Sequence, residues 1–226
     1  MFDRIAPRYD ALNRILSLGM DRGWRRRAVA ALDLPSAAEV LDVATGTADV
    51  ALRIARTAAQ VRVVGVDPSA NMLAVGQGKV AAAGLGARVT LAPGDCQALP
   101  FADGCFDGTI IAFGIRNVPD RRRGLHELAR VTRPGRPVVV LELNEPPAGG
   151  LGFFARTYVH QIVPRVGAWL SGAREYRYLQ ESVAAFPAPA AFAELMREAG
   201  LAVRAVQSLG FGTCTLFVGV VEGRTP

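Results

Sequence analysis

Three acidic residues end or follow apolar segments of the chain, at positions where a small molecule could be held. Asp42 lies near the end of the segment 39–43, Asp67 follows 61–66, and Asp95 comes shortly after 88–92. If these segments are parallel strands, their carboxyl ends meet at one sheet edge, where ligands bind in open α/β folds. An acid at the tip of the second strand can hold a ribose diol, which predicts an adenosine cofactor.

The glycine turn after the first of these strands narrows the choice of cofactor. A dinucleotide needs three spaced glycines so that the backbone can approach its pyrophosphate, and the segment 45–49 has only Gly46. Asp49 also adds a negative charge at the start of the next helix, where an anion would bind. This pattern favours a cationic ligand without phosphate, and S-adenosylmethionine is such a ligand.

Each residue of this group has an expected partner on the cofactor. Gly46 lets the turn pass close to the ligand, and Thr47 and the turn amides face the methionine carboxylate. The remaining side chains are assigned as follows: Asp42 to the ammonium, Asp67 to the ribose hydroxyls, and Asp95 with Cys96 to the adenine edge. Any one acid could instead be a helix cap or a turn residue, and for Asp95 alone that interpretation is favoured. Their joint position at three strand ends favours a cofactor site.

The hydrophobic pattern predicts the elements that position these residues. Apolar residues at helical spacing predict an N-terminal helix from about 10 to 32. Strands and helices then alternate, with strands at 39–43, 61–66, 88–92, 108–113 and 137–143 and helices at 48–57, 69–83 and 121–131. After a helix at 190–199, strands at 201–208 and 213–221 are joined by a short turn, which makes them antiparallel. The fold expected is α/β: a doubly wound, mostly parallel seven-stranded sheet with an antiparallel C-terminal hairpin, as in the Rossmann-like class I methyltransferases.

The length of 226 residues suits one domain, with a helical cover at 1–35 and a helical insertion at 146–187. The insertion follows the fifth strand and is rich in large apolar residues. It is either an extra helical pair packed on the core or a cover for an apolar substrate, and both can hold.

Composition limits the partners and the compartment. The net charge of +6 allows attraction to nucleic acid or anionic lipid, but the arginines are dispersed and form no aromatic-rich basic stripe. We therefore expect no nucleic-acid partner, and the arginine clusters at 25–27 and 121–123 are interpreted as solvated helix faces. Three cysteines without CxxC spacing indicate neither disulfides nor a metal site. With no signal peptide and no apolar span, a cytoplasmic location is expected, with peripheral and transient membrane contact.

Four further segments, spread over nearly the whole chain, resemble segments of the ubiquinone/menaquinone biosynthesis C-methyltransferases. They are FDRIAPRYDALN at 2–13, FGIRNVPD at 113–120, RVTRPG at 130–135 with the acid at 142, and YLQES at 178–182. The resemblance implies transfer of a methyl group from S-adenosylmethionine to a ring carbon of a prenylated quinol. In menaquinone biosynthesis, this reaction converts demethylmenaquinol to menaquinol. In ubiquinone biosynthesis, the equivalent substrate is a methoxy-benzoquinol precursor. The chain has Ala112 and Asp21 where the family usually has serine and histidine.

The resemblance carries the cofactor positions Thr47, Asp67, Asp95 and Cys96, and the chemistry of the implied reaction indicates the catalytic residues. A quinol must lose a hydroxyl proton before its ring carbon becomes a good nucleophile, so the quinolate needs stabilisation. Arg116 is expected to stabilise it or to orient a water, Asn117 to hold the same oxygen, and Tyr9 to close the site. Two rivals stay open: a methyltransferase for another small molecule, and a non-catalytic scaffold that binds the cofactor.

Overall fold

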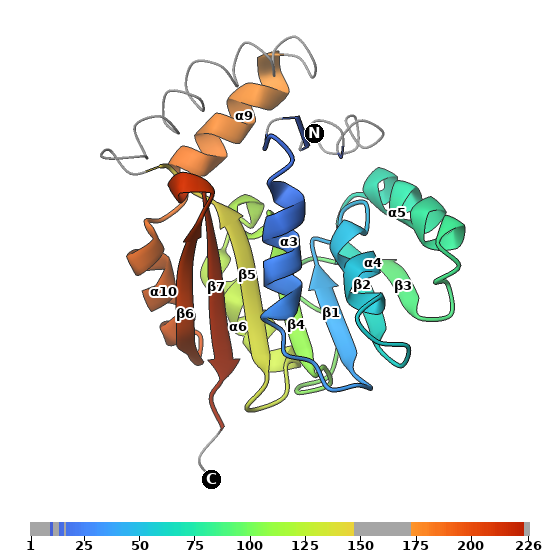
Figure 1. Cartoon of the computed structure of the whole chain (residues 1–226). Helices are drawn as coiled ribbons and strands as arrows, with labels where there is room; N and C mark the ends of the chain where they lie inside the picture. The colour runs from blue at the N-terminus through green and yellow to red at the C-terminus, as the bar shows by residue number, and fades with distance from the viewer. Residues whose placement is uncertain (1–9, 11–13, 16, 147–172, 224–226) are drawn as a thin grey trace.

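A computed structural model describes residues 10, 14–15, 17–146 and 173–223 of the chain, which form a seven-stranded sheet with helices on both faces (Figure 1). The strand order is β3-β2-β1-β4-β5-β7-β6. The strands span β1 Glu39–Val43, β2 Arg62–Asp67, β3 Val89–Pro93, β4 Gly108–Ala112, β5 Pro137–Leu143, β6 Leu201–Leu209 and β7 Cys214–Val221. This arrangement confirms the expected fold class.

The carboxyl ends of β1 to β5 meet at one edge because neighbouring strands among them run parallel. β7 breaks this pattern, since it lies between β5 and β6 and pairs antiparallel with both. The 3-10 turn η4, Gly210–Gly212, joins β6 to β7. The short connection predicted from the sequence is therefore confirmed as an antiparallel hairpin.

The helices divide between the two faces of the sheet (Figure 1). Helices α3 Asp21–Ala30, α4 Asp49–Ala55 and α5 Ala70–Ala82 lie on one face, and α6 Arg121–Val131 and α10 Pro189–Glu198 lie on the other. Each face has its own cluster of buried apolar side chains, one around α3 and α4 and the other around α6 and α10. Because apolar side chains on both sides fix the sheet, its carboxyl edge can carry a rigid site.

The predicted N-terminal helix is not continuous. Leu18 and Gly19 have φ angles of 51° and 77°, in the left-handed region, and α3 begins only at Asp21. The Gly19 amide donates to the Arg14 carbonyl oxygen at 2.8 Å, which closes a turn before α3. The expectation of one helix from 10 to 32 is wrong because apolar spacing alone does not show a glycine-centred turn.

Part of the predicted insertion is helical. Helix α9, Ala173–Ala184, lies beyond the carboxyl ends of the central strands (Figure 1). Residues 147–172 lie outside the described part of the chain, so the apolar run expected to cover a substrate is not placed. None of the described helices has the length and apolar character required to span a membrane.

Candidate active site

A cavity of about 330 Å³ lies at the carboxyl edge of the sheet. Its lining includes seven of the nine residues predicted to form the site: Asp42, Gly46, Thr47, Asp67, Asp95, Cys96 and Asn117. The two others are Arg116, which does not line the cavity, and Tyr9, which lies outside the described residues. The fold thus brings together every residue that the sequence assigned to the cofactor.

The turn between β1 and α4 forms the floor of this cavity in an uncommon backbone conformation. Ala44, Gly46 and Ala48 have φ angles of 53°, 55° and 64°, which only glycine adopts without strain. Two backbone contacts hold the turn: the Thr45 amide donates to the Val66 carbonyl at 3.0 Å, and the Gly46 amide donates to Asp67 Oδ2 at 2.9 Å. Backbone strain held by neighbouring structure is common at ligand sites.

Asp42 supplies a buried carboxylate to the cavity. The residue is 1 % exposed, and its Oδ2 accepts a hydrogen bond of 2.6 Å from Thr45 Oγ1. Burial raises the pKa of Asp42 to about 7, although the Thr45 hydrogen bond and the charge of Arg25 oppose the rise. A cation bound next to this carboxylate would favour its ionised form. The site therefore suits the ammonium assigned to Asp42.

Asp67 ends β2 and connects the turn to the start of α5. Its Oδ1 accepts from the Ser69 amide at 2.8 Å, while Oδ2 accepts from the Gly46 amide. Ser69 in turn caps α5, since its hydroxyl oxygen accepts from the Met72 amide at 3.2 Å. These contacts fix the carboxylate at the strand tip, where Asp67 lines the cavity.

Asp95 and Cys96 follow β3 and form the far side of the cavity. Asp95 Oδ1 accepts from the Gln97 amide at 2.9 Å, and the residue is exposed. The Cys96 side chain is buried, and burial raises the pKa of its thiol to about 12. Cys96 is consequently a neutral packing residue next to the ligand space, and it cannot act as a thiolate at neutral pH.

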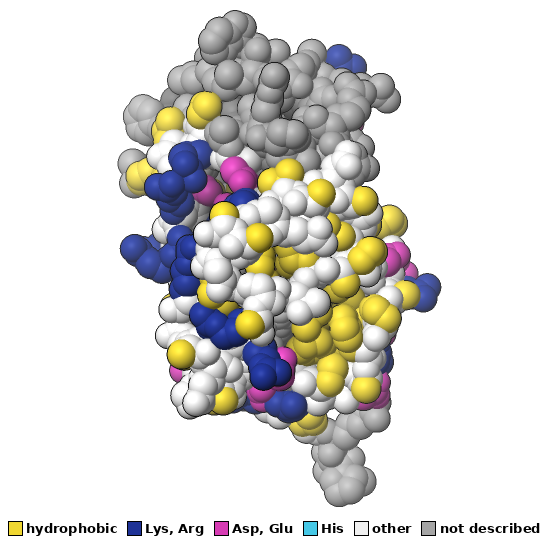
Figure 2. Space-filling view, turned by 90° about the vertical axis from the view of Figure 1, so that its right-hand side faces the viewer, with side chains coloured by type: hydrophobic (Ala, Val, Ile, Leu, Met, Phe, Trp, Pro, Cys, Tyr) yellow, Lys and Arg dark blue, Asp and Glu magenta, His cyan; other side chains and the backbone are white. Residues whose placement is uncertain are grey.

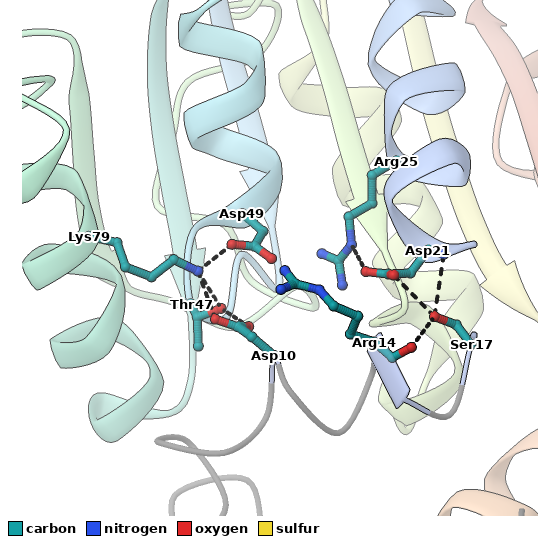
Figure 3. A network of polar contacts seen from close by, with 8 residues as sticks. All are labelled: Asp10, Arg14, Ser17, Asp21, Arg25, Thr47, Asp49 and Lys79. Atoms are coloured by element: carbon teal, nitrogen blue, oxygen red, sulfur yellow. Dashed lines mark hydrogen bonds and ion pairs between the residues drawn. The ribbon is translucent and has the colours of Figure 1, made fainter. Parts of the chain in front are cut away.

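Lys79, the only lysine of the chain, links α5 to the glycine turn (Figure 3). Its Nζ donates to Asp10 Oδ2 at 2.9 Å and to Thr47 Oγ1 at 3.2 Å, and it forms a short ion pair with Asp49. The Thr47 hydroxyl also donates to Asp10 at 2.6 Å. The hydroxyl of Thr47 is thus already occupied, which leaves its backbone amide for a ligand. Lys79 pairs with Asp10 as well as with Asp49, so it offsets only part of the negative charge at the start of α4.

Arg116 and Asn117 belong to the 3-10 turn η2, Ile115–Asn117, but they face different surroundings. The Arg116 guanidinium is buried and donates to Glu142 Oε1 and to the Phe113 carbonyl oxygen, each at 2.6 Å. Asn117 lines the cavity, and its Oδ1 accepts from the Tyr178 hydroxyl of α9 at 3.2 Å. Arg116 therefore secures the turn from which Asn117 reaches the cavity.

Sequence reasoning missed Arg25. It was interpreted as solvated, but it is only 9 % exposed and lines the cavity, with its Cζ 5.1 Å from the centre of the Phe113 ring. Its Nε lies 3.6 Å from Asp21 Oδ2. That acid stands four residues earlier on the same helix face, and this spacing was the available signal of a fixed side chain.

The charges of the cavity fit the cofactor expected. Three carboxylates, from Asp42, Asp67 and Asp95, face one guanidinium, that of Arg25, among the described lining residues. Such a balance suits a ligand with cationic centres and a ribose diol, and it disfavours a pyrophosphate. The buried Asp42 carboxyl, whose pKa is raised, also fits an ammonium partner.

The fold and this cavity define a class I S-adenosylmethionine-dependent methyltransferase. The chain belongs to the ubiE/COQ5 methyltransferase family, whose model matches residues 1–221. It is 47 % identical to the demethylmenaquinone methyltransferase of Thermus thermophilus over 97 % of this chain and 99 % of that protein. It is 45 % identical to the ubiquinone/menaquinone biosynthesis C-methyltransferase UbiE of Geobacter sulfurreducens, covering 97 % and 86 % of the two chains.

Solved structures agree on the fold. A S-adenosylmethionine-dependent methyltransferase from Aquifex aeolicus superposes with a TM-score of 0.64 at 17 % identity, covering 87 % of this chain and 89 % of that chain. This structure supports the fold, and membership of the family confirms the expected class of enzyme and its cofactor, S-adenosylmethionine. The family resemblance inferred from the sequence is likewise confirmed.

Proposed function

We propose that this protein transfers the methyl group of S-adenosylmethionine to a ring carbon of demethylmenaquinol, which yields menaquinol. The observation that carries the proposal is the match to a demethylmenaquinone methyltransferase over nearly the whole length of both chains. The ubiquinone branch is the second candidate, because other relatives are named for both quinones. Initial rates with demethylmenaquinol and with the methoxy-benzoquinol precursor distinguish the two, and we expect the faster rate with demethylmenaquinol.

The cofactor site is assigned to the residues that line the carboxylate-rich cavity. Asp42 would hold the ammonium, the amides of the turn at Gly46 and Thr47 the carboxylate, and Asp67 the ribose diol. Asp95 and Cys96 would border the adenine. When bound, S-adenosylmethionine supplies an electrophilic methyl group on a sulfonium.

The acceptor side of the cavity is assigned to Asn117 and Arg25. The Asn117 side-chain nitrogen has no hydrogen-bond partner among the described residues, whereas its Oδ1 is held by Tyr178. That nitrogen can donate to a quinol oxygen, and the nearby guanidinium of Arg25 can stabilise the charge that develops there. The role first expected of Arg116 thus passes to these two side chains. Tyr9, assigned to closing the site, remains a proposal outside the described residues.

Arg116 is proposed as a positioning residue. Its guanidinium is bound to Glu142 and to the Phe113 carbonyl, and its own amide donates to Glu142 Oε2 at 3.1 Å. These contacts fix η2 against β5 and thereby fix the direction of Asn117. A buried ion pair of this kind is costly to break from one side, since the remaining charge is left without compensation.

The prenyl tail requires an apolar path, which we assign to the insertion at 146–187. Burial of each CH₂ group of the tail contributes about 0.8 kcal/mol. Helix α9 supports the assignment, because Tyr178 connects it to the cavity residue Asn117. We further propose a cytoplasmic protein that visits the membrane surface transiently to collect its substrate, with no nucleic acid as partner.

A further inference from the structure

A second cavity, of about 630 Å³, lies between α3 and α4 and is strongly basic. Six arginines line it, three from α3, two from α4 or the residue after it, and one from the turn before α3: Arg22, Arg25, Arg26, Arg53, Arg56 and Arg14. Basic side chains gather along one side of the molecule in the space-filling view, on the face that carries α3 and α4 (Figure 2). Of these six arginines, only Arg25 also lines the carboxylate-rich cavity. The proposed methyl transfer uses none of the other five.

The two acids in the wall of this basic cavity are already paired. Asp21 accepts from Ser17 Oγ at 3.0 Å and forms an ion pair with Arg25, and Asp49 pairs with Lys79 (Figure 3). The other arginine side chains of the wall have no ion pair within the ranges that the structure describes. Several guanidinium groups therefore line one cavity without a counter-charge, and their combined positive potential attracts an anion.

The composition of the wall indicates the kind of anion. Planar guanidinium groups donate two parallel hydrogen bonds to carboxylate or phosphate oxygens, and a cluster of them suits the higher charge and the additional oxygens of a phosphate. The cavity is larger than one phosphate needs, and part of its wall is apolar, from Val29, Ala30 and Leu52. These features fit a phosphate that carries an organic substituent.

Exposed apolar side chains next to the basic cavity indicate the source of that phosphate. Ile15 and Leu18, beside Arg14 in the turn before α3, are 44 % and 68 % exposed. Both side chains lie close in sequence to Arg14 and Asp21, which line the cavity. Exposed apolar groups beside arginines are typical of surfaces that lie on an anionic bilayer.

We propose that the basic cavity between α3 and α4 binds the phosphate head group of an anionic phospholipid, with Ile15 and Leu18 inserted into the same membrane surface. The purpose of this contact rests on the proposed function, because a prenylated quinol is dissolved in the bilayer. The binding itself does not depend on methyl transfer. A membrane-bound enzyme would present its sheet edge to the bilayer that holds its substrate.

Vesicle co-sedimentation of the full chain tests this site. The probe is vesicles of phosphatidylglycerol and phosphatidylcholine, compared with phosphatidylcholine alone and with inorganic pyrophosphate in solution. The test variant is Arg26→Gln/Arg53→Gln/Arg56→Gln. The control, Arg27→Gln/Arg62→Gln/Arg204→Gln, removes the same net charge from positions that do not line the cavity. Each arginine near an anionic surface contributes about fivefold to partitioning, so the test variant should bind the anionic vesicles at least about tenfold more weakly.

The outcomes separate the possible explanations. Loss of binding in the cavity variant with near wild-type binding in the control supports the proposal. Equal losses in both variants would show attraction by net charge alone, and binding of pyrophosphate without vesicles would show a soluble ligand; either result overturns the proposal. Methyl transfer to detergent-dispersed demethylmenaquinol is measured on the same proteins. No transfer by the wild type would refute the proposed function and leave the vesicle result unaffected.

Discussion

At the scale of single residues, the buried carboxyl of Asp42 should reduce the stability of the folded chain at neutral and alkaline pH. Burial raises the pKa of this carboxyl from 3.8 to about 7, since the interior disfavours its charge. Between these two values the folded chain keeps a proton that the unfolded chain has lost. The free energy of unfolding therefore falls as pH rises through this window and stays low above it.

Replacement of this acid should stabilise the protein without cofactor. We expect Asp42→Asn to raise the melting temperature at pH 8, by at most the equivalent of about 4 kcal/mol at about 1.4 kcal/mol per pKa unit. At about pH 4 the gain should vanish, because Asp42 is then neutral in the wild type. Thermal unfolding at both pH values measures this, and an Asp42→Asn protein less stable at pH 8 would contradict the account.

The same carboxyl should make cofactor binding depend on pH. An ammonium binds the ionised form of Asp42, so affinity for S-adenosylmethionine should fall up to about tenfold per pH unit below about 7. Calorimetric titrations between about pH 5.5 and 7 avoid the titration of the cofactor's α-amino group, whose pKa lies near 8. The matched variant Asp42→Asn should bind more weakly at pH 7 and show no such slope. A wild-type affinity that is constant over this range would exclude the assignment.

Arg116 provides the third test at this scale. Arg116→Ala leaves Glu142 buried without its cation, which should cost about 3–5 kcal/mol of stability. Below its melting temperature, that variant should lose at least about tenfold in kcat while its cofactor affinity changes little, because Asn117 is displaced and Asp42 is not. Arg116→Lys should recover part of kcat. Equal losses in kcat and cofactor affinity would show that Arg116 has no positioning role.

At the scale of elements, the junction of β4 with η2 must lie close to the glycine turn. A Cβ atom at Gly114 would lie 2.5 Å from the Ala44 Cβ, which is closer than van der Waals contact allows. We expect Gly114→Ala to lower the free energy of unfolding by about 1–3 kcal/mol. It should also slow catalysis, since Arg116 and Asn117 follow directly.

Gly78 is the matched control for this substitution. It lies inside α5, and a Cβ there would meet nothing within 4 Å. Gly78→Ala should therefore stabilise the protein by up to about 1 kcal/mol through helix propensity. Urea denaturation of both variants measures the difference, and equal effects would contradict the close packing between η2 and the turn.

The elements also show where sequence reasoning succeeds. Alternating strands and helices, with acids at strand ends, are local patterns, and β1 to β5 formed where those patterns predicted them. The break at Leu18 and Gly19 was missed, because the left-handed conformation overrides an apolar pattern that continues through it. Helix α9 was expected only as part of a helical insertion.

The site was less predictable than the fold, for reasons of tertiary structure. The acids Asp42, Asp67 and Asp95 could be placed because each is fixed to the end of a strand. The partners of Arg116 and Lys79 could not be placed, because these long side chains bind groups that are distant in sequence. The Arg116–Glu142 pair, for example, joins residues 26 positions apart. The direction of such a side chain depends on its packing against residues from other segments of the chain.

At the scale of the whole molecule, the two cavities differ in charge and would bind different ligands. In our proposal, the acidic one at the sheet edge would hold the cationic cofactor, and the basic one between α3 and α4 would bind an anionic membrane surface. Arg25 lines both cavities and so lies between the two proposed sites. The overall charge of +6 supports attraction to that surface.

The identity of the methylated atom tests the central claim most directly. The purified protein is incubated with demethylmenaquinol and S-adenosylmethionine carrying an isotope-labelled methyl group, and the product is analysed by mass spectrometry and NMR. We predict one labelled methyl group on the ring carbon, with loss of the ring proton there, to give menaquinol. A label on a quinol oxygen, or no transfer by a protein that binds the cofactor, would contradict this account.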